Sequence, residues 1–79
     1  MKIDHLEVQF DFSKLLGKIK ECGYTQETLA DVIGMHLSTL NKKLNNGSYF
    51  TTVEICRICD VLGIVANEIG IYFYCLKSS

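Results

Sequence analysis

The 79-residue sequence contains no proline, no internal repeat and no recognisable linker, which predicts a single domain over residues 1–79. It also lacks an excess of positive charge. Eight Lys+Arg stand against nine Asp+Glu, for a net charge of −1, whereas nucleic-acid-binding domains are usually basic. A DNA-binding interpretation therefore depends on where the charges fall along the chain.

Long hydrophobic runs are missing as well. The most apolar stretch, residues 69–76, is interrupted by Gly70 and is far too short to cross a bilayer. The N-terminus carries acidic residues where a signal peptide needs a basic region. We therefore expect a cytoplasmic protein with no membrane partner, whose four cysteines are reduced thiols. Because a core, a pocket and a supporting shell rarely fit in so short a chain, we expect no enzymatic activity.

Helix start and stop signals are clear and predict an all-α domain. Thr25 and Thr51 are good N-caps, and Gly34 and Gly63 stand where helices end. The signals predict five helices, over residues 12–22, 25–33, 37–45, 51–62 and 66–69. In the first of these, the residues predicted to share the buried face are Phe12, Leu15, Leu16, Ile19 and Cys22.

The two chain ends differ from the middle. Val8, Phe10 and Phe12 alternate with polar residues at a period of two, and residues 71–76 are rich in aromatic strand formers. One short antiparallel pairing between these ends is a possible addition to the helical domain.

Two short helices joined through Gly34 form a helix-turn-helix pattern. The motifs that carry a family resemblance lie at residues 23–30, 33–35, 38–40, 45–47 and 58–64. In order and spacing, this sequence resembles the lambda repressor/Cro-type helix-turn-helix family over about residues 12–69, with extensions at 1–11 and 70–79. Because the chain is short, it is most similar within this family to the small Cro-like regulators of phages and prophages. The resemblance implies a five-helix fold in which the third helix enters the DNA major groove.

The third helix has two faces. Leu37, Leu40 and Leu44 follow helical spacing and form an apolar stripe. A polar stripe on the other side is formed by Ser38, Asn41, Lys42 and Asn45. Amide side chains pair with adenine and lysine with guanine acceptors, so this stripe suits base contacts.

The family resemblance extends this set of candidates. It implies a contact of Gln26 with the DNA backbone or an edge base, and phosphate contacts near the end of the third helix. The full set of DNA-contact candidates is Gln26, His36, Leu37, Ser38, Thr39, Asn41, Lys42, Lys43, Asn45 and Asn46.

Several positions depart from the family pattern. His36 occupies the cap of the third helix, Thr28 replaces the usual capping-box glutamate, and no arginine lies on the polar stripe. Leu37 stands where the family usually has a polar residue. It could cover a thymine methyl or contact a protein, but we favour a buried Leu37 because it completes the apolar stripe.

These observations predict a transcriptional regulator of repressor type that occupies a double-stranded DNA operator. We expect a homodimer with its two recognition helices about 34 Å apart. The aromatic tail is the expected dimer seam, with the residues Ile71, Tyr72, Phe73 and Tyr74. The alternative is a protein-interaction module that uses the same scaffold to bind and modulate another repressor.

Cys56 and Cys59 form a C-x-x-C pattern in the fourth predicted helix. A zinc site needs four ligands, and the other candidates are scattered along the chain. A redox pair normally belongs to a thioredoxin-like βαβ context, which is missing here. We therefore interpret both cysteines as small core residues and expect no metal, cofactor or small-molecule substrate.

Overall fold

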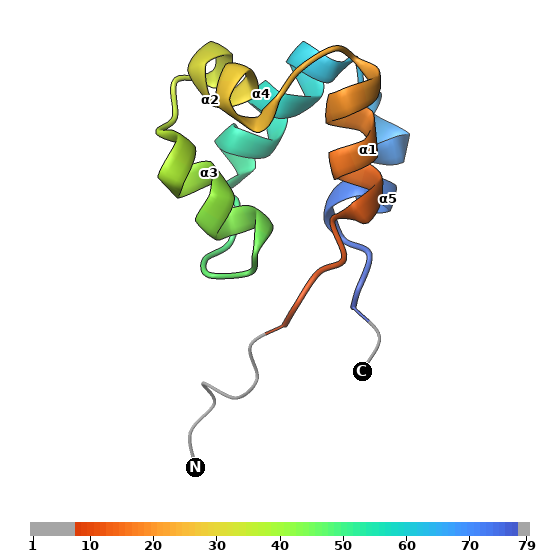
Figure 1. Ribbon diagram of the computed structural model, residues 1–79. Coiled ribbons are helices and arrows are strands. Elements are labelled where there is room, and N and C mark those ends of the chain that lie inside the picture. Colours follow the sequence, from red (N-terminus) through yellow and green to blue (C-terminus); the bar gives the residue numbers. More distant parts are fainter. Residues whose placement is uncertain (1–7, 78–79) are drawn as a thin grey trace.

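The computed structural model describes residues 8–77 and confirms the all-α prediction. Figure 1 shows α2 and α3 on one side of the molecule, α1 and α5 on the other, and α4 between the two pairs. The elements in chain order are α1 (Ser13–Glu21), α2 (Gln26–Ile33), α3 (Leu37–Leu44), α4 (Thr52–Leu62), the 3-10 helix η2 (Ala66–Glu68) and α5 (Ile69–Phe73). The helix α2 packs against both α3 and α4, and α1 packs against α5.

The helix boundaries follow from the capping residues. The Thr51 hydroxyl accepts a hydrogen bond from the Glu54 N–H, and the Glu54 carboxylate accepts one from the Thr51 N–H. Thr28 performs the same reciprocal role for Thr25, with its hydroxyl 2.8 Å from the Thr25 nitrogen. A hydroxyl therefore replaces the expected glutamate without loss of the capping box.

The core is one cluster drawn from every α-helix. Its buried members are Phe12, Leu15, Ile19, Leu29, Ala30, Ile33, Leu40, Leu44, Ile55, Ile58, Cys59, Leu62, Ile64 and Phe73. Our prediction of burial is wrong for Leu16 and Cys22, both of which are exposed. Successive residues on a helix point about 100° apart. The buried face of α1 therefore includes Leu15, while Leu16 lies at the edge of that face.

The C-terminal aromatic segment, residues 71–76, is not a strand. Its first half forms α5, which carries the Phe73 ring into the core, where it contacts Phe50 edge-on. Burial of this ring overrides the strand propensity of the aromatic residues. The predicted terminal pairing is limited to an isolated antiparallel bridge between Phe10 and Leu76.

Candidate functional site: the α3 face and an aromatic groove

The first candidate surface is the α2–turn–α3 unit. Gly34 ends α2 in the left-handed conformation, with φ of 74°, and the Met35 N–H returns to the Ala30 carbonyl at 2.8 Å. His36 then caps α3 in an extended conformation, without a side-chain hydrogen bond to the helix. Three residues thus separate two helices of eight residues each, which is a helix-turn-helix arrangement.

The predicted DNA-contact residues differ in their access to solvent. Those that are exposed are His36, Leu37, Ser38, Lys42 and Asn45. Those that are partly buried are Gln26, Thr39, Asn41 and Asn46. DNA contact by the exposed residues stays a prediction.

Leu37 corrects our expectation. Its side chain is 39% exposed, so the prediction that it continues the buried stripe is wrong. The core already receives Leu40 and Leu44 from α3, and Leu37 in the first turn lies beyond the edge of the packed region. Leu37 therefore adds an apolar side chain to the exposed surface.

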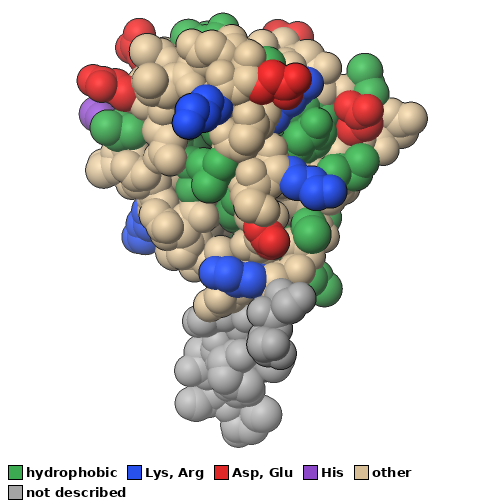
Figure 2. Space-filling model, turned by 45° about the vertical axis from the view of Figure 1, so that its right-hand side comes forward, with side chains coloured by type: hydrophobic (Ala, Val, Ile, Leu, Met, Phe, Trp, Pro, Cys, Tyr) green, Lys and Arg blue, Asp and Glu red, His purple; other side chains and the backbone are tan. Residues whose placement is uncertain are grey.

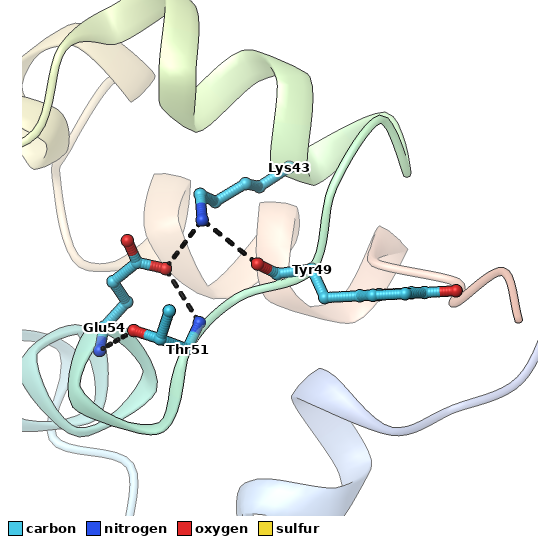
Figure 3. Close-up of polar contacts among 4 residues, drawn as sticks. All are labelled: Lys43, Tyr49, Thr51 and Glu54. Carbon is cyan, nitrogen blue, oxygen red and sulfur yellow. Dashed lines mark hydrogen bonds and ion pairs between the residues drawn. The ribbon is translucent and has the colours of Figure 1, made fainter. Parts of the chain in front are cut away.

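Lys43 also differs from its expected role as a DNA contact, because it points into the molecule (Figure 3). Its Nζ donates to the Tyr49 carbonyl at 3.0 Å and to the Glu54 Oε1 at 2.9 Å. The same carboxylate oxygen accepts the Thr51 N–H at 2.8 Å. Lys43 thus connects α3 to the capping box of α4. Its charge is paired with Glu54 inside the molecule and does not face solvent.

The environment of Glu54 fits this role. Burial raises the pKa of its carboxyl group. The hydrogen bond from the Thr51 N–H, together with the hydrogen bond and the charge of the Lys43 ammonium, lowers this pKa by more than burial raises it. The net result is a pKa below the ordinary value. The carboxylate is therefore held in its charged form beside Lys43.

The two asparagines at the end of α3 are likewise engaged within the chain. The Asn45 carboxamide nitrogen donates to the Asn41 carbonyl at 2.8 Å. Asn46 bonds the Phe10 backbone twice, accepting from its N–H at 2.8 Å and donating to its carbonyl at 3.0 Å. Asn46 therefore acts as a structural residue here.

Acidic side chains flank the N-terminal end of α3. A shallow hollow between α2 and α3 is lined by Glu27, Thr28, Ala30, Asp31, Met35, His36 and Leu37. Glu27, Asp31 and Leu37 are all exposed. Beside the α3 polar stripe, this part of the surface combines negative charge with apolar groups.

A second candidate surface is an apolar groove near the described chain ends, with a volume of about 310 Å³. We call it the aromatic groove, and its lining residues are Val8, Phe10, Phe12, Tyr49, Phe50, Ile55, Phe73 and Tyr74. The Phe10 ring lies edge-on to Tyr49 and to Tyr74, with centroids about 6 Å away. Val8, Tyr49 and Tyr74 are exposed at its rim.

Our sequence reasoning missed the aromatic groove. The alternation of Val8, Phe10 and Phe12 was a signal that the N-terminal segment has an apolar side. The adjacent pair Tyr49 and Phe50 was a second signal, but their proximity to the N-terminal segment follows only from the folded chain.

The predicted dimer seam is divided by the fold. Ile71 and Tyr74 are exposed, Tyr72 is partly buried, and Phe73 is only 2% exposed. Phe73 is therefore a core residue of its own chain. Ile71 and Tyr74 remain as surface groups.

The cysteines of the C-x-x-C pattern also differ from one another. Cys59 is buried in α4, and this burial raises the pKa of its thiol. The nearby Cys56 raises the same pKa by a smaller amount. Cys56 is exposed, so its assignment to the core is wrong. Within residues 8–77, no three His, Cys, Asp or Glu side chains are grouped in a way that could hold a metal ion.

Charges on the rest of the surface are mixed. On the face shown in Figure 2, basic and acidic side chains are interspersed with hydrophobic ones rather than gathered into a basic patch. None of the helices in the described part of the chain has the length and apolar character of a membrane span.

Comparison with known proteins assigns the chain to a family. It belongs to the family described as "Protein of unknown function (DUF739)", whose model matches residues 8–75. It is also similar to a solved structure, the modulator of repression (MOR) of the temperate bacteriophage TP901-1 from Lactococcus lactis. The TM-score is 0.73 and the sequence identity 35%, covering 84% of this chain and 89% of that chain. No curated protein matched the sequence.

These findings define a small helical protein related to a phage regulator. They support a phage connection and leave membership of the lambda repressor/Cro family as a resemblance.

Proposed function

We propose that this chain is a phage or prophage regulator that modulates a repressor by binding the repressor protein. The observation that carries this proposal is the similarity, over most of both chains, to a solved modulator of repression. The role is regulatory and non-enzymatic. It corresponds to a protein-interaction module built on a helix-turn-helix scaffold.

The charge on α3 supports protein binding over independent DNA binding. DNA affinity depends on Lys and Arg side chains that neutralise phosphates. Lys43 is paired internally with Glu54, which leaves Lys42 as the exposed lysine of α3. The neighbouring Glu27 and Asp31 would repel phosphate.

The aromatic groove is the surface we assign to the partner. Interface cores are enriched in aromatic side chains and depleted of charge. The rim residues Tyr49 and Tyr74 are both about half exposed, and the groove lining is almost entirely apolar. An apolar side chain of the repressor would fill this groove and remove these rings from water.

The test is a calorimetric titration of this chain with the full-length repressor from the same phage or prophage. Tyr74→Ser should weaken binding about tenfold or more, because aromatic anchors at interface centres carry much of the affinity. Val65→Ser is the matched control, since Val65 is about as exposed as Tyr74 but lies outside the groove lining. Failure of the unmodified chain to bind the full-length repressor at high micromolar concentration would contradict the proposal.

A second candidate function is direct operator binding as a dimer. The exposed polar stripe of α3, with Ser38, Lys42 and Asn45, favours it. In that case Lys42→Ala should weaken operator binding, and ultracentrifugation should show a dimer that Ile71→Ser disrupts. A monomer on a single half-site with unchanged affinity would eliminate this candidate.

A further inference from the structure

The extended segment of residues 8–11, which we call the strap, is hydrogen-bonded along both edges. On one edge, the Asp11 N–H donates to the Cys75 carbonyl at 2.7 Å, and the Lys77 N–H donates to the Gln9 carbonyl at 2.9 Å. These are the bonds of a short antiparallel pairing around Phe10 and Leu76. The C-terminal segment thus pairs with one edge of the strap.

Two side chains complete the other edge. The Asn46 carboxamide bonds both the N–H and the carbonyl of Phe10. The Tyr49 hydroxyl accepts from the Val8 N–H at 2.8 Å and donates to the Val8 carbonyl at 2.9 Å. The backbone N–H and carbonyl groups of Val8 and Phe10 point to the same edge, because those of alternate residues in an extended chain do so. Two side chains from the α3–α4 connection therefore take the place of a neighbouring strand.

Asn46 is suited to this position by its backbone as well. Its φ is 65°, a left-handed conformation that glycine and asparagine tolerate best. Of these two residues only asparagine has a carboxamide, which supplies both the donor and the acceptor that an exposed peptide edge requires. The same residue thus ends α3 and holds the strap.

The strap is also connected to α3 and α4. The carbonyl of Tyr49 accepts the Lys43 ammonium, which pairs in turn with Glu54 of α4. A chain of hydrogen bonds therefore runs from Val8 through Tyr49 and Lys43 to the α4 capping box.

The strap also forms part of the aromatic groove. Val8 and Phe10 line it, and the Phe10 ring lies edge-on to both Tyr49 and Tyr74. Lifting the strap would remove this wall and uncover Phe12, which is buried in the described fold.

We propose that the strap is a conformational device: it docks to complete the aromatic groove, and Asn46 and Tyr49 are the positioning residues that hold it closed. Undocking removes one wall of the groove and breaks the bonds between Asn46, at the C-terminal end of α3, and Phe10. The consequence for repressor binding rests on the proposed function. The docking itself stands on the hydrogen bonds alone.

The test is amide hydrogen exchange, measured by NMR on the full chain. Asn46→Gly keeps the left-handed backbone unstrained and removes the side chain that carries the carboxamide. We expect exchange at Phe10, Asp11 and Lys77 to accelerate together, by about tenfold or more. Exchange at Ile58, in the core of α4, should be unchanged.

Matched variants separate the device from general destabilisation. Asn45→Ala removes the adjacent carboxamide, which bonds only its own helix, and should leave exchange in the strap unchanged. Tyr49→Phe keeps the ring, removes the hydroxyl and should accelerate exchange at Val8. If Asn46→Gly unfolds the chain, Tyr49→Phe alone decides the question.

Unchanged exchange at Phe10 in Asn46→Gly, or an equal acceleration at Ile58, would overturn the proposal. Repressor binding then tests the consequence separately. Faster strap exchange with unchanged affinity would overturn the role of the strap in forming the groove. No binding even by the unmodified chain would instead contradict the proposed function, while the exchange results would still decide whether the strap docks.

Discussion

Replacing Lys43 by methionine tests whether this lysine is an internal strut or a surface contact. Methionine keeps the apolar stem and removes the ammonium group. The change deletes two charge-assisted hydrogen bonds, to the Tyr49 carbonyl and to the Glu54 carboxylate. We expect a large loss of stability with little change in the helices themselves.

The magnitude follows from the burial of the pair. Removing one partner of a fully buried ion pair costs about 3–5 kcal/mol. The Lys43 side chain is 10% exposed and that of Glu54 23%, so water can partly rehydrate the remaining carboxylate. Glu54 also keeps its bond from the Thr51 N–H. We therefore expect a loss of about 2–3 kcal/mol in the free energy of unfolding, lowering Tm by about 10–20 °C in a domain of this size.

The pH dependence gives a second signature. The folded-state pKa of Glu54 lies below its ordinary value, so its contribution to stability is present above the unfolded-state pKa. That contribution is lost as the pH falls through the folded-state pKa. Because Lys43→Met removes one cause of the depression, the stability difference between the two proteins should shrink as the pH falls from 7 to about 3.

The assay is thermal unfolding followed by circular dichroism at several pH values. Lys42→Met is the matched control, because Lys42 is exposed and makes no ion pair among the described residues. It should change stability by less than about 0.5 kcal/mol. Equal effects of the two substitutions, or a Lys43→Met difference independent of pH, would refute the strut assignment.

Three further predictions concern the stability of the chain and the reactivity of its cysteines. Gly47→Ala should destabilise the chain, because an added Cβ would lie 2.6 Å from Lys42 Cγ and 3.1 Å from the Lys42 carbonyl oxygen. Gly17→Ala, in open space within α1, should instead stabilise the chain by about 0.5–1 kcal/mol. Chemical denaturation measures both changes, and the opposite signs would contradict this prediction. Cys59→Ser should cost about 1–3 kcal/mol by placing a hydroxyl in the core, whereas Cys56→Ser should be nearly neutral; equal Tm values for the two variants would argue against the burial difference. A thiol reagent should modify Cys56 much faster than Cys59 in the folded chain, and mass spectrometry after partial labelling would reveal the opposite order.

Local signals explain why much of the helical framework could be predicted. Caps such as Thr51 and stops such as Gly34 act through bonds to residues a few positions away, so they are visible in the sequence. Helical spacing likewise identified the buried Leu40 and Leu44.

Non-local contacts explain the errors. Lys43 looks like a surface lysine until α4 places Glu54 beside it, eleven residues further along the chain. Phe73 looks like part of an exposed strand until α5 turns it toward Phe50. The aromatic groove depends on bringing residues 8–12 against the α3–α4 connection, which no periodicity within either segment encodes.

The central claim is that the partner is a repressor protein, and the salt dependence of binding tests it most directly. Fluorescence anisotropy of the labelled chain would be measured with a random DNA duplex and with the full-length repressor, from 50 to 200 mM salt. Neutralising phosphates releases counterions, so a DNA-binding protein that makes 6–10 phosphate contacts loses about 10³–10⁵ in affinity over this range. We predict weak duplex binding without such a slope and saturable binding of the repressor. Tight duplex binding with a steep slope, and no binding of the repressor, would contradict the account.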